Sequence, residues 1–207
     1  MSIELIHGDC MDYMRSLPDN AFELAIVDPP YGIDWNKQTK NVNTGKNWIQ
    51  HEYKDWDGKS PTPEYFKELY RVSKNQIIWG ANYYIDMPPS PCWLIWDKMQ
   101  EFTGAVFEMA WTSFKSPAKA FRMSRVEAYC GIGKIHPTQK PVKLYQWLIS
   151  NYASLGDRIL DTHLGSGSSA IAAHYAGHDF VGIELDENYF KAAKKRFDES
   201  TKQEALF

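Results

Sequence analysis

Cysteine is scarce in this sequence, and its spacing fits no metal site. The 207 residues contain three cysteines, far apart: Cys10, Cys92 and Cys130. His174 and His178 are four residues apart, but Gly177 weakens a helix between them and no third ligand is near. We therefore expect no metal centre. Unpaired, scattered cysteines also favour a reducing compartment, the cytoplasm.

Long hydrophobic runs and an excess of positive charge are missing as well. No apolar stretch approaches the roughly 20 residues of a membrane-spanning helix, and the chain does not start with a basic and then apolar signal segment. We expect a protein that is neither secreted nor membrane-spanning. The formal net charge of −3 at pH 7 excludes a uniformly basic coat for nucleic acid. Any contact with phosphates must come from a local patch.

No linker, internal repeat or low-complexity tract divides the chain. With 43% hydrophobic residues, the 207 residues are enough for one domain whose sheet is covered by helices on both faces. We expect a single domain over residues 1–207. Two stretches lack periodicity: a mobile loop over about residues 32–60 and an irregular insert over about residues 112–135.

Short apolar runs alternate with amphipathic segments along the rest of the chain. The apolar runs predict strands over residues 3–7, 23–27, 76–79, 93–96, 106–114, 158–160 and 180–183. The amphipathic segments predict helices over residues 11–17, 61–72, 142–152, 168–175 and 188–197. This alternation is typical of a doubly wound, mostly parallel α/β sheet.

The most informative stretch is Asp28-Pro29-Pro30-Tyr31, which directly follows a predicted strand. Ligands bind at the carboxyl ends of strands in open α/β sheets. The two prolines remove two backbone N–H groups, so this corner offers only acceptors, the Asp28 carboxylate and the neighbouring carbonyls. Such a corner suits an exocyclic NH₂ group, and Tyr31 adds a face on which a planar base can stack. Taken alone, the four residues fit a simple Pro-Pro turn with a buried tyrosine equally well.

A second informative stretch runs from Asp161 to Ala170 and contains Gly165-Ser166-Gly167. It follows a predicted strand, opens a predicted helix and precedes Glu184 by about twenty residues, which is the layout of a nucleotide-binding βαβ unit. Glu184 can accept hydrogen bonds from both ribose hydroxyls. Asp161 would repel the pyrophosphate of a dinucleotide but attract a sulfonium such as that of S-adenosylmethionine.

Together, in this order, the two stretches resemble the β-class amino-methyltransferases of DNA, in their adenine-N6-specific form. Further matching segments are Gly8-Asp9-Cys10, Trp79-Gly80, Trp96-Asp97-Lys98 and His136-Pro137-Thr138-Gln139-Lys140-Pro141. The resemblance covers nearly the whole chain. One segment departs from it, because Thr162-His163-Leu164 stands where relatives most often carry Pro-Phe and a small residue.

The resemblance implies a Rossmann-like methyltransferase sheet of seven strands with a permuted motif order. Across the sheet, the predicted strands would lie in the order 3–7, 180–183, 158–160, 23–27 and 76–79. The antiparallel strand 106–114 and then the strand 93–96 would follow. The switch point would fall between the strands at 159 and 24 and bring Asp161 beside Asp28.

The resemblance also implies an activity: transfer of the methyl group of S-adenosylmethionine to N6 of an adenine flipped out of double-stranded DNA, at a specific site. The implied catalytic residues are Asp28, Pro29, Pro30 and Tyr31. The implied cofactor contacts are Asp9, Cys10, Asp28, Lys140, Asp161, Leu164, Gly165, Ser166, Gly167, Ser168, Glu184 and Leu185, with Thr138 or Lys140 near the cofactor carboxylate. For Lys140, a solvated lysine at a helix start is an equally good interpretation.

DNA contacts are predicted within the irregular insert. Between residues 112 and 134, five Lys and Arg residues face a single acidic residue, Glu127, and aromatic side chains are interleaved with them. The predicted DNA-binding residues are Lys115, Lys119, Arg122 and Arg125. A solvated loop is the alternative, in which case the Lys-rich loop over residues 36–59 is the better candidate. The short chain leaves little room for a separate recognition domain, which favours a short DNA site or a homodimer. Such enzymes belong to the bacterial cytoplasm, or to the host cytoplasm if phage-encoded.

Four other functions remain to be compared. An N4-cytosine methyltransferase usually has serine in place of Asp28. A release-factor glutamine methyltransferase usually has asparagine there, and its cofactor loop comes first. A catalytically silent DNA-binding module would not need both Asp28 and Glu184, and Asp161 disfavours an NAD-dependent oxidoreductase.

Overall fold

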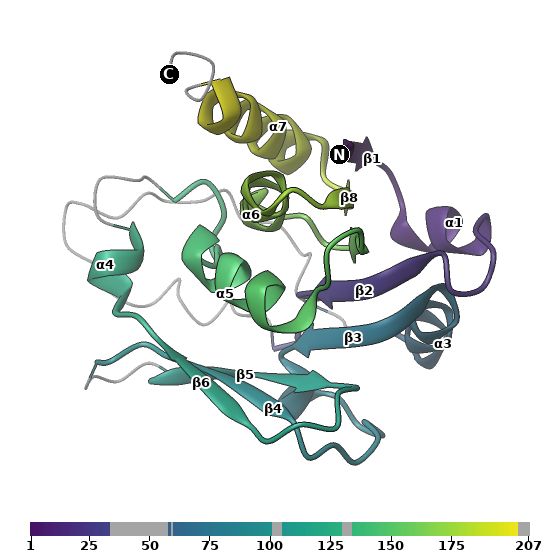
Figure 1. Cartoon of the computed structure of the whole chain (residues 1–207), viewed down its shortest axis with the longest axis vertical. Coiled ribbons are helices and arrows are strands. Elements are labelled where there is room, and N and C mark those ends of the chain that lie inside the picture. Colours follow the sequence, from purple (N-terminus) through teal and green to yellow (C-terminus); the bar gives the residue numbers. More distant parts are fainter. Residues whose placement is uncertain (34–57, 59, 101–104, 130–133, 203–207) are drawn as a thin grey trace.

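The centre of the protein is an eight-stranded sheet (Figure 1). The computed structural model describes residues 1–33, 58, 60–100, 105–129 and 134–202. The sheet has the order β1-β8-β7-β2-β3-β5-β4-β6. Its strands are β1 (Ile3–His7), β2 (Phe22–Val27), β3 (Ser73–Trp79), β4 (Trp93–Asp97), β5 (Phe107–Thr112), β6 (Lys119–Arg122), β7 (Arg158–Asp161) and β8 (Asp179–Glu184). Among these strands β5 runs antiparallel to both of its neighbours, and the other pairs are parallel.

The predicted fold class is confirmed, with one addition to the sheet. All seven predicted strands are present in the predicted order. The prediction of an irregular insert was wrong in part, because β6 pairs with β4 and α4 (Arg125–Tyr129) follows it. Four residues are too few for an alternating pattern to stand out, so β6 carried no signal. The predicted loop over residues 32–60 lies mostly outside the described residues.

Helices cover both faces of the sheet (Figure 1). They are α1 (Cys10–Arg15), α3 (Pro63–Val72), α5 (Val142–Tyr152), α6 (Ser168–Ala176) and α7 (Glu187–Lys202), with a 3₁₀ turn η2 (Ala81–Tyr83) after β3. Along β2, Leu24 and Ile26 pack into the core beneath α5 and α6, while Ala25 and Val27 pack into the core beneath α1 and α3. Successive residues of a strand point to opposite faces, so the continuous apolar run of β2 supplies both cores.

The strand register brings the two informative stretches together. β2 and β7 are parallel neighbours, with Leu24 beside Ile159 and Ala25 beside Leu160. Asp28 therefore leaves the sheet at the same edge as Asp161, at the predicted switch point. Among the described residues, no helix is both long and apolar enough to cross a membrane.

Candidate active site

A cavity of about 680 Å³ lies at the carboxyl ends of β1, β2, β7 and β8. It is lined by Gly8, Asp9, Cys10, Asp28, Pro30, His136, Thr138, Gln139, Lys140, Tyr145, Thr162, His163, Leu164, Gly165, Ser166, Ser168, Glu184, Leu185, Asp186 and Tyr189. These include every residue predicted to contact the cofactor except Asp161 and Gly167. The structure thus brings the predicted set together around one hollow, at the edge where α/β sheets bind ligands.

A tight turn joins β7 to α6 and forms one wall of the cavity. Gly167 caps α6 in the left-handed conformation, with φ of 73°. A side chain here would be strained, and its Cβ would lie 3.3 Å from the carbonyl oxygen of Ala193 in α7. Arg196 of α7 donates to the Ser166 carbonyl at 2.7 Å and to the Ser168 hydroxyl at 2.9 Å. The turn is therefore fixed from behind by α7.

Glu184 at the end of β8 both faces the cavity and supports this turn. Its carboxylate accepts from the backbone N–H of Gly165 at 2.8 Å and from that of Asp186 at 3.0 Å. Burial raises the pKa of Glu184 above its usual range. Each carboxylate oxygen keeps a second acceptor position, so Glu184 can also accept hydrogen bonds from a ligand in the cavity.

Asp161 lies behind the turn, where it braces the backbone. Ser169 donates to Oδ2 at 2.5 Å, and the backbone N–H of His163 donates to Oδ1 at 3.0 Å. Burial, with the nearby Asp28 and Glu184 carboxylates, raises the pKa of Asp161 to about 7. Its predicted contact with a cofactor stays a prediction, because the side chain is absent from the cavity lining.

The segment that departs from the family pattern is tied to α3. The hydroxyls of Tyr65 and Thr162 are 2.6 Å apart, and the Thr162 hydroxyl lies 2.9 Å from Nδ1 of His163. Burial lowers the pKa of His163 to about 4, so its ring is neutral at pH 7. A hydrogen-bonded chain thus forms this wall of the cavity, and no local pattern around Tyr65 indicates its part in it.

The corner after β2 holds its acceptors in fixed positions. Tyr31 donates to Oδ1 of Asp28 at 2.7 Å, and Lys140 contacts Oδ2. Tyr84 donates to the Pro29 carbonyl at 2.9 Å. A carboxylate oxygen or a carbonyl oxygen has a second acceptor position, so each can still bind a target amine.

The ring of Tyr31 is also held in place. It stacks on the half-exposed ring of Tyr83, with centroids 5.1 Å apart and an interplanar angle of 15°. Gly80 leaves room for it, since a Cβ at Gly80 would lie 2.0 Å from Cε1 of Tyr31. Only glycine fits this close approach at a φ of 70°.

Lys140 is buried against the corner at Asp28, so its interpretation as a solvated lysine was wrong. Its side chain is 1% exposed, and its ammonium lies 3.1 Å from Oε2 of Glu108 in addition to its contact with Asp28. Lys98 lies 2.8 Å from Oε1 of the same Glu108. Although burial acts the other way, Lys140 and Lys98 lower the pKa of Glu108 to about 2. Burial also opposes the charged form of Lys140, yet Asp28 and Glu108 raise its pKa.

The sequence carries one signal for Glu108. It is the only charged residue in β5, whose other residues are apolar except for Thr112. A lone carboxylate in such a strand costs free energy unless it is paired. It therefore indicates a buried partner, here Lys140.

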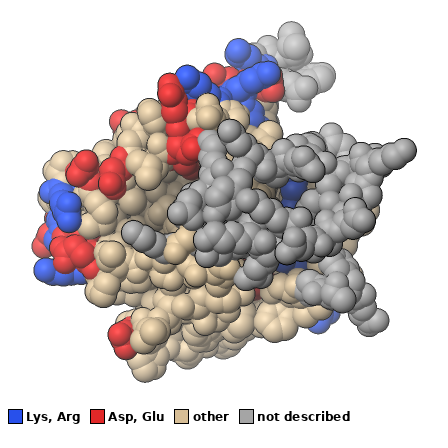
Figure 2. All heavy atoms as spheres, turned by 180° about the vertical axis from the view of Figure 1, so that it is seen from behind, with Lys and Arg blue, Asp and Glu red and all other residues tan. Residues whose placement is uncertain are grey.

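The four predicted DNA-binding residues do not form one patch. In β6, Arg122 pairs with Asp97 at the carboxyl end of β4, whereas Lys119 pairs with Leu94 near its start. Lys115 lies at the amino end of β3, in a separate hollow with Ser73. On the face seen in Figure 2, described acidic and basic side chains are likewise intermixed. Arg122 ends β6 and Arg125 begins α4 just after it, so both lie nearer than the two lysines to the edge of the sheet at which β2 and β7 end.

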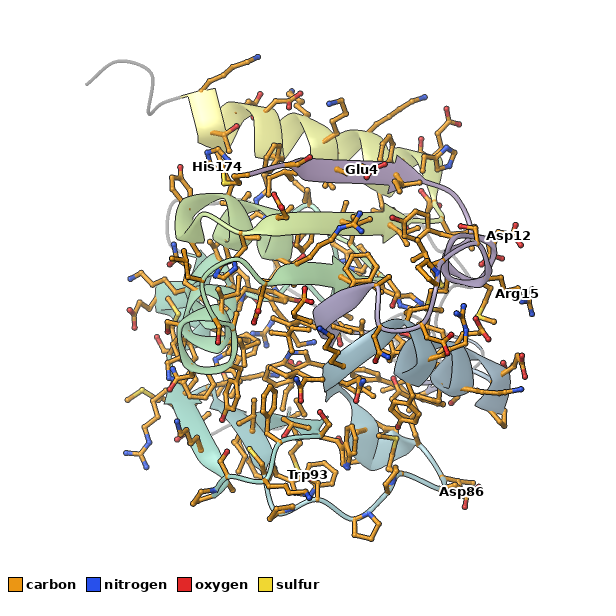
Figure 3. The ribbon with its side chains drawn as sticks, turned by 45° about the vertical axis from the view of Figure 1, so that its right-hand side comes forward. Glu4, Asp12, Arg15, Asp86, Trp93 and His174 are labelled. Carbon is orange, nitrogen blue, oxygen red and sulfur yellow. The ribbon has the colours of Figure 1, made fainter. Side chains whose placement is uncertain are left out.

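No grouping of three His, Cys, Asp or Glu side chains within the described ranges could hold a metal ion. His174 lies on α6 (Figure 3), and the His178 ring is 3.1 Å from the Asp157 carbonyl oxygen. Cys130 lies outside the described residues.

Comparison with known proteins identifies the family. A model described as DNA methylase, covering N6 and N4 enzymes, matches residues 33–195. The chain belongs to this DNA methylase family. The protein is therefore a DNA methyltransferase. It is 21% identical over 256 residues to the Type II methyltransferase M2.MboI of Moraxella bovis, covering 97% of this chain and 89% of that protein.

Solved structures share the fold of the methylase. The M1.HpyAVI–SAM complex matches with a TM-score of 0.60 and 20% identity, covering 95% of this chain and 99% of that one. The cytosine-N4-specific PvuII DNA methyltransferase matches with a TM-score of 0.61 and 13% identity, covering 98% and 91%. At these identities the structural likeness establishes the fold, so the target base must be argued from the site itself.

Proposed function

We propose that this methylase transfers the methyl group of S-adenosylmethionine to N6 of an adenine flipped out of double-stranded DNA at a specific site. The observation that carries the proposal is the shared cavity. The acceptor corner at Asp28 and the glycine turn with Glu184 open into the same hollow of about 680 Å³. Cofactor and target amine can therefore meet beside Asp28.

The cavity fits the chemistry of S-adenosylmethionine. Four of its lining residues carry carboxylates, Asp9, Asp28, Glu184 and Asp186, which suit the ribose hydroxyls and a positively charged sulfonium. Leu164 and Leu185 give the same cavity apolar surface for a base. When bound, this cofactor supplies an electrophilic methyl group.

The residues of the corner act on the nucleophile. The exocyclic nitrogen of adenine is a weak nucleophile because its lone pair is delocalised into the ring. Hydrogen bonds from its two N–H groups to the Asp28 carboxylate and the Pro29 carbonyl favour a pyramidal nitrogen with a localised lone pair. Fixed acceptors of this kind typically contribute on the order of 10² to 10³ in rate. As the nitrogen–carbon bond forms and the sulfur–carbon bond breaks, the nitrogen loses one proton, to Asp28 or to water.

The target base has to leave the duplex to reach this corner. Flipping costs a few kcal/mol, and stacking on an aromatic ring returns roughly 1–3 kcal/mol. Tyr31 and the adjoining Tyr83 provide aromatic surface beside Asp28. We expect Arg122 and Arg125 to contact DNA phosphates or bases from the same edge of the sheet, and we expect no such contact from Lys115.

Adenine is favoured over cytosine by the first residue of the corner. N4-cytosine enzymes usually carry serine where this chain has Asp28. Transfer to N4 of cytosine is the second candidate, because the fold is shared with the cytosine-N4-specific PvuII enzyme.

Methylated nucleosides distinguish the two candidates. Purified protein is incubated with unmethylated DNA of mixed sequence and S-adenosylmethionine carrying a labelled methyl group. The DNA is then digested to nucleosides, which are separated by chromatography with mass detection. We expect label in N6-methyl-2′-deoxyadenosine. Label in N4-methyl-2′-deoxycytidine instead would refute the adenine assignment.

A further inference from the structure

Four side chains of alternating charge lie in a row beside the catalytic corner. Lys140 contacts Asp28 and lies 3.1 Å from Glu108, and Lys98 lies 2.8 Å from the other oxygen of Glu108. We call these four residues, Asp28, Lys140, Glu108 and Lys98, the charge chain. Their side chains are between 1% and 24% exposed, so water screens the charges weakly.

The ammonium of Lys140 is fully used within the fold. It has three N–H donors, and its partners are the Asp28 carboxylate, the Glu108 carboxylate and the Tyr31 hydroxyl at 3.1 Å. Binding a cofactor carboxylate would require one of these contacts to break. The geometry therefore opposes the cofactor role that the family resemblance implied for Lys140.

The segment that carries Lys140 is itself held in place. The backbone N–H of Ile135 donates to the Gln139 side chain at 3.0 Å, and the Tyr129 hydroxyl donates to the Gln139 carbonyl. The Lys140 ammonium also lies 5.2 Å from the centre of the buried Trp79 ring. A lysine positioned in this way cannot move toward a ligand without a large cost in free energy, because its contacts with the fold would break.

We propose that Lys140 and Glu108 are positioning residues that keep Asp28 ionised and oriented as an acceptor for the target amine, and that Lys140 does not bind the cofactor. This inference rests on the proposed function. Lys140 fixes Oδ2 of Asp28 while Tyr31 fixes Oδ1, so the plane of the carboxylate is set before a base arrives. Glu108 holds Lys140 from the other side, and Lys98 neutralises Glu108.

Among the described residues, few other groups near Asp28 can carry charge at pH 7. Tyr31 and Tyr145 are buried phenols with pKa values raised well above the usual one, mainly by burial. Burial likewise raises the pKa of Tyr129. Tyr84 packs against the same corner through its bond to Pro29. Asp161, from β7, is a further ionisable neighbour of Asp28, and its own titration near pH 7 must be separated by a variant.

The charge chain predicts opposite shifts in the pH dependence of kcat/KM for variants of Lys140 and Glu108. Burial raises the pKa of Asp28, and Lys140 opposes that rise while Glu108 adds to it. Lys140→Met should move the acid limb of kcat/KM to higher pH, because Asp28 loses its cation. Glu108→Gln should move the same limb to lower pH, because Asp28 loses a neighbouring negative charge. General damage to the fold would not shift the two variants in opposite directions.

The experiment compares these variants with a matched control. Lys143 is three residues beyond Lys140, in the first turn of α5, but it is 67% exposed and 3.6 Å from Glu127, so Lys143→Met should leave the acid limb of kcat/KM in place. At pH 7, Lys140→Met should lose about 10- to 100-fold in kcat. Its Kd for S-adenosylmethionine, measured by calorimetry, should stay within about threefold of the unchanged protein. Lys140→Arg should recover part of kcat. A Kd weakened about tenfold or more with kcat retained would overturn the proposal and make Lys140 a cofactor contact.

A second measurement reads Asp28 without any turnover. The carboxyl ¹³C signals of aspartate-labelled protein are titrated, with Asp28→Asn identifying the Asp28 signal and Asp161→Asn identifying its neighbour. Opposite movements of the Asp28 titration in Lys140→Met and Glu108→Gln support the proposal, whichever base is methylated. No movement, or movement in the same direction, overturns it even if the protein methylates adenine.

Discussion

Asp28→Asn removes the negative charge of the corner proposed to be catalytic while keeping the shape of the side chain. The variant should fold, because Lys140 keeps Glu108 at 3.1 Å as a partner. The amide oxygen can still accept from Lys140, and the amide NH₂ can donate to the Tyr31 hydroxyl. What is lost is the charged acceptor for the target amine, at the point where positive charge develops on nitrogen.

The size of the loss follows from that contact. A hydrogen bond to a charged group contributes about 1.5–3 kcal/mol, and a fixed group that stabilises developing charge is typically worth on the order of 10² to 10³ in kcat. We therefore expect kcat of Asp28→Asn to fall by about that factor. The Kd for S-adenosylmethionine should change little, since the proposed ribose acceptor Glu184 and the glycine turn are untouched.

The assay is transfer of labelled methyl groups to DNA under single-turnover conditions, with cofactor binding measured separately by calorimetry. Asp12→Asn is the control, because Asp12 is on the outer side of α1 and points away from the cavity (Figure 3). Single-turnover rates of Asp28→Asn equal to those of Asp12→Asn would refute the role given to Asp28. A fall in rate fully explained by lost cofactor binding would do the same.

Three further predictions test other parts of the site. Glu184→Gln keeps one acceptor for the Gly165 N–H but loses the charge, so calorimetry should show a Kd for S-adenosylmethionine weakened by about 10- to 100-fold; an unchanged Kd would move the ribose site elsewhere. Folding raises the pKa of Asp161 from 3.8 to about 7. Ionising Asp161 therefore costs more free energy in the folded protein than in the unfolded chain, and the fold loses stability as pH rises through this range. The Tm of Asp161→Asn, relative to that of the unchanged protein, should increase between pH 5 and pH 8. A constant difference in Tm would contradict the buried carboxylate. Arg122→Ala should weaken DNA binding and reduce the slope of log affinity against log salt by about one, whereas Lys115→Ala should leave the slope unchanged; equal effects would contradict their placement at opposite edges.

The sheet could be predicted from the sequence because its signals are local. Apolar runs such as Ile26 and Val27 in β2 mark buried strands, and the glycine turn marks the start of α6. The order of the strands came from the family resemblance and not from periodicity. β6 was missed because four residues with exposed Lys119 and Arg122 at the ends give no apolar pattern.

The contacts within the site depend on residues far apart in the sequence, which local patterns do not encode. Glu108 meets Lys140 only because β5 runs antiparallel beside β3, and Tyr65 reaches Thr162 only because α3, which packs against β3, brings it to the end of β7. Lys140 illustrates the consequence. The motif around Lys140 indicates a site residue. Its partners Asp28 and Glu108 follow from the tertiary structure, which places the end of β2, β5 and the segment before α5 side by side.

Sequencing of DNA methylated by the purified protein tests the central claim most directly. DNA amplified without modification is treated with protein and S-adenosylmethionine, and modified bases are mapped on single molecules, with Asp28→Asn as the background. The account predicts modified adenines that share one short sequence context and that are strongly reduced with Asp28→Asn. Modified cytosines, or adenines modified without a shared context, would contradict it.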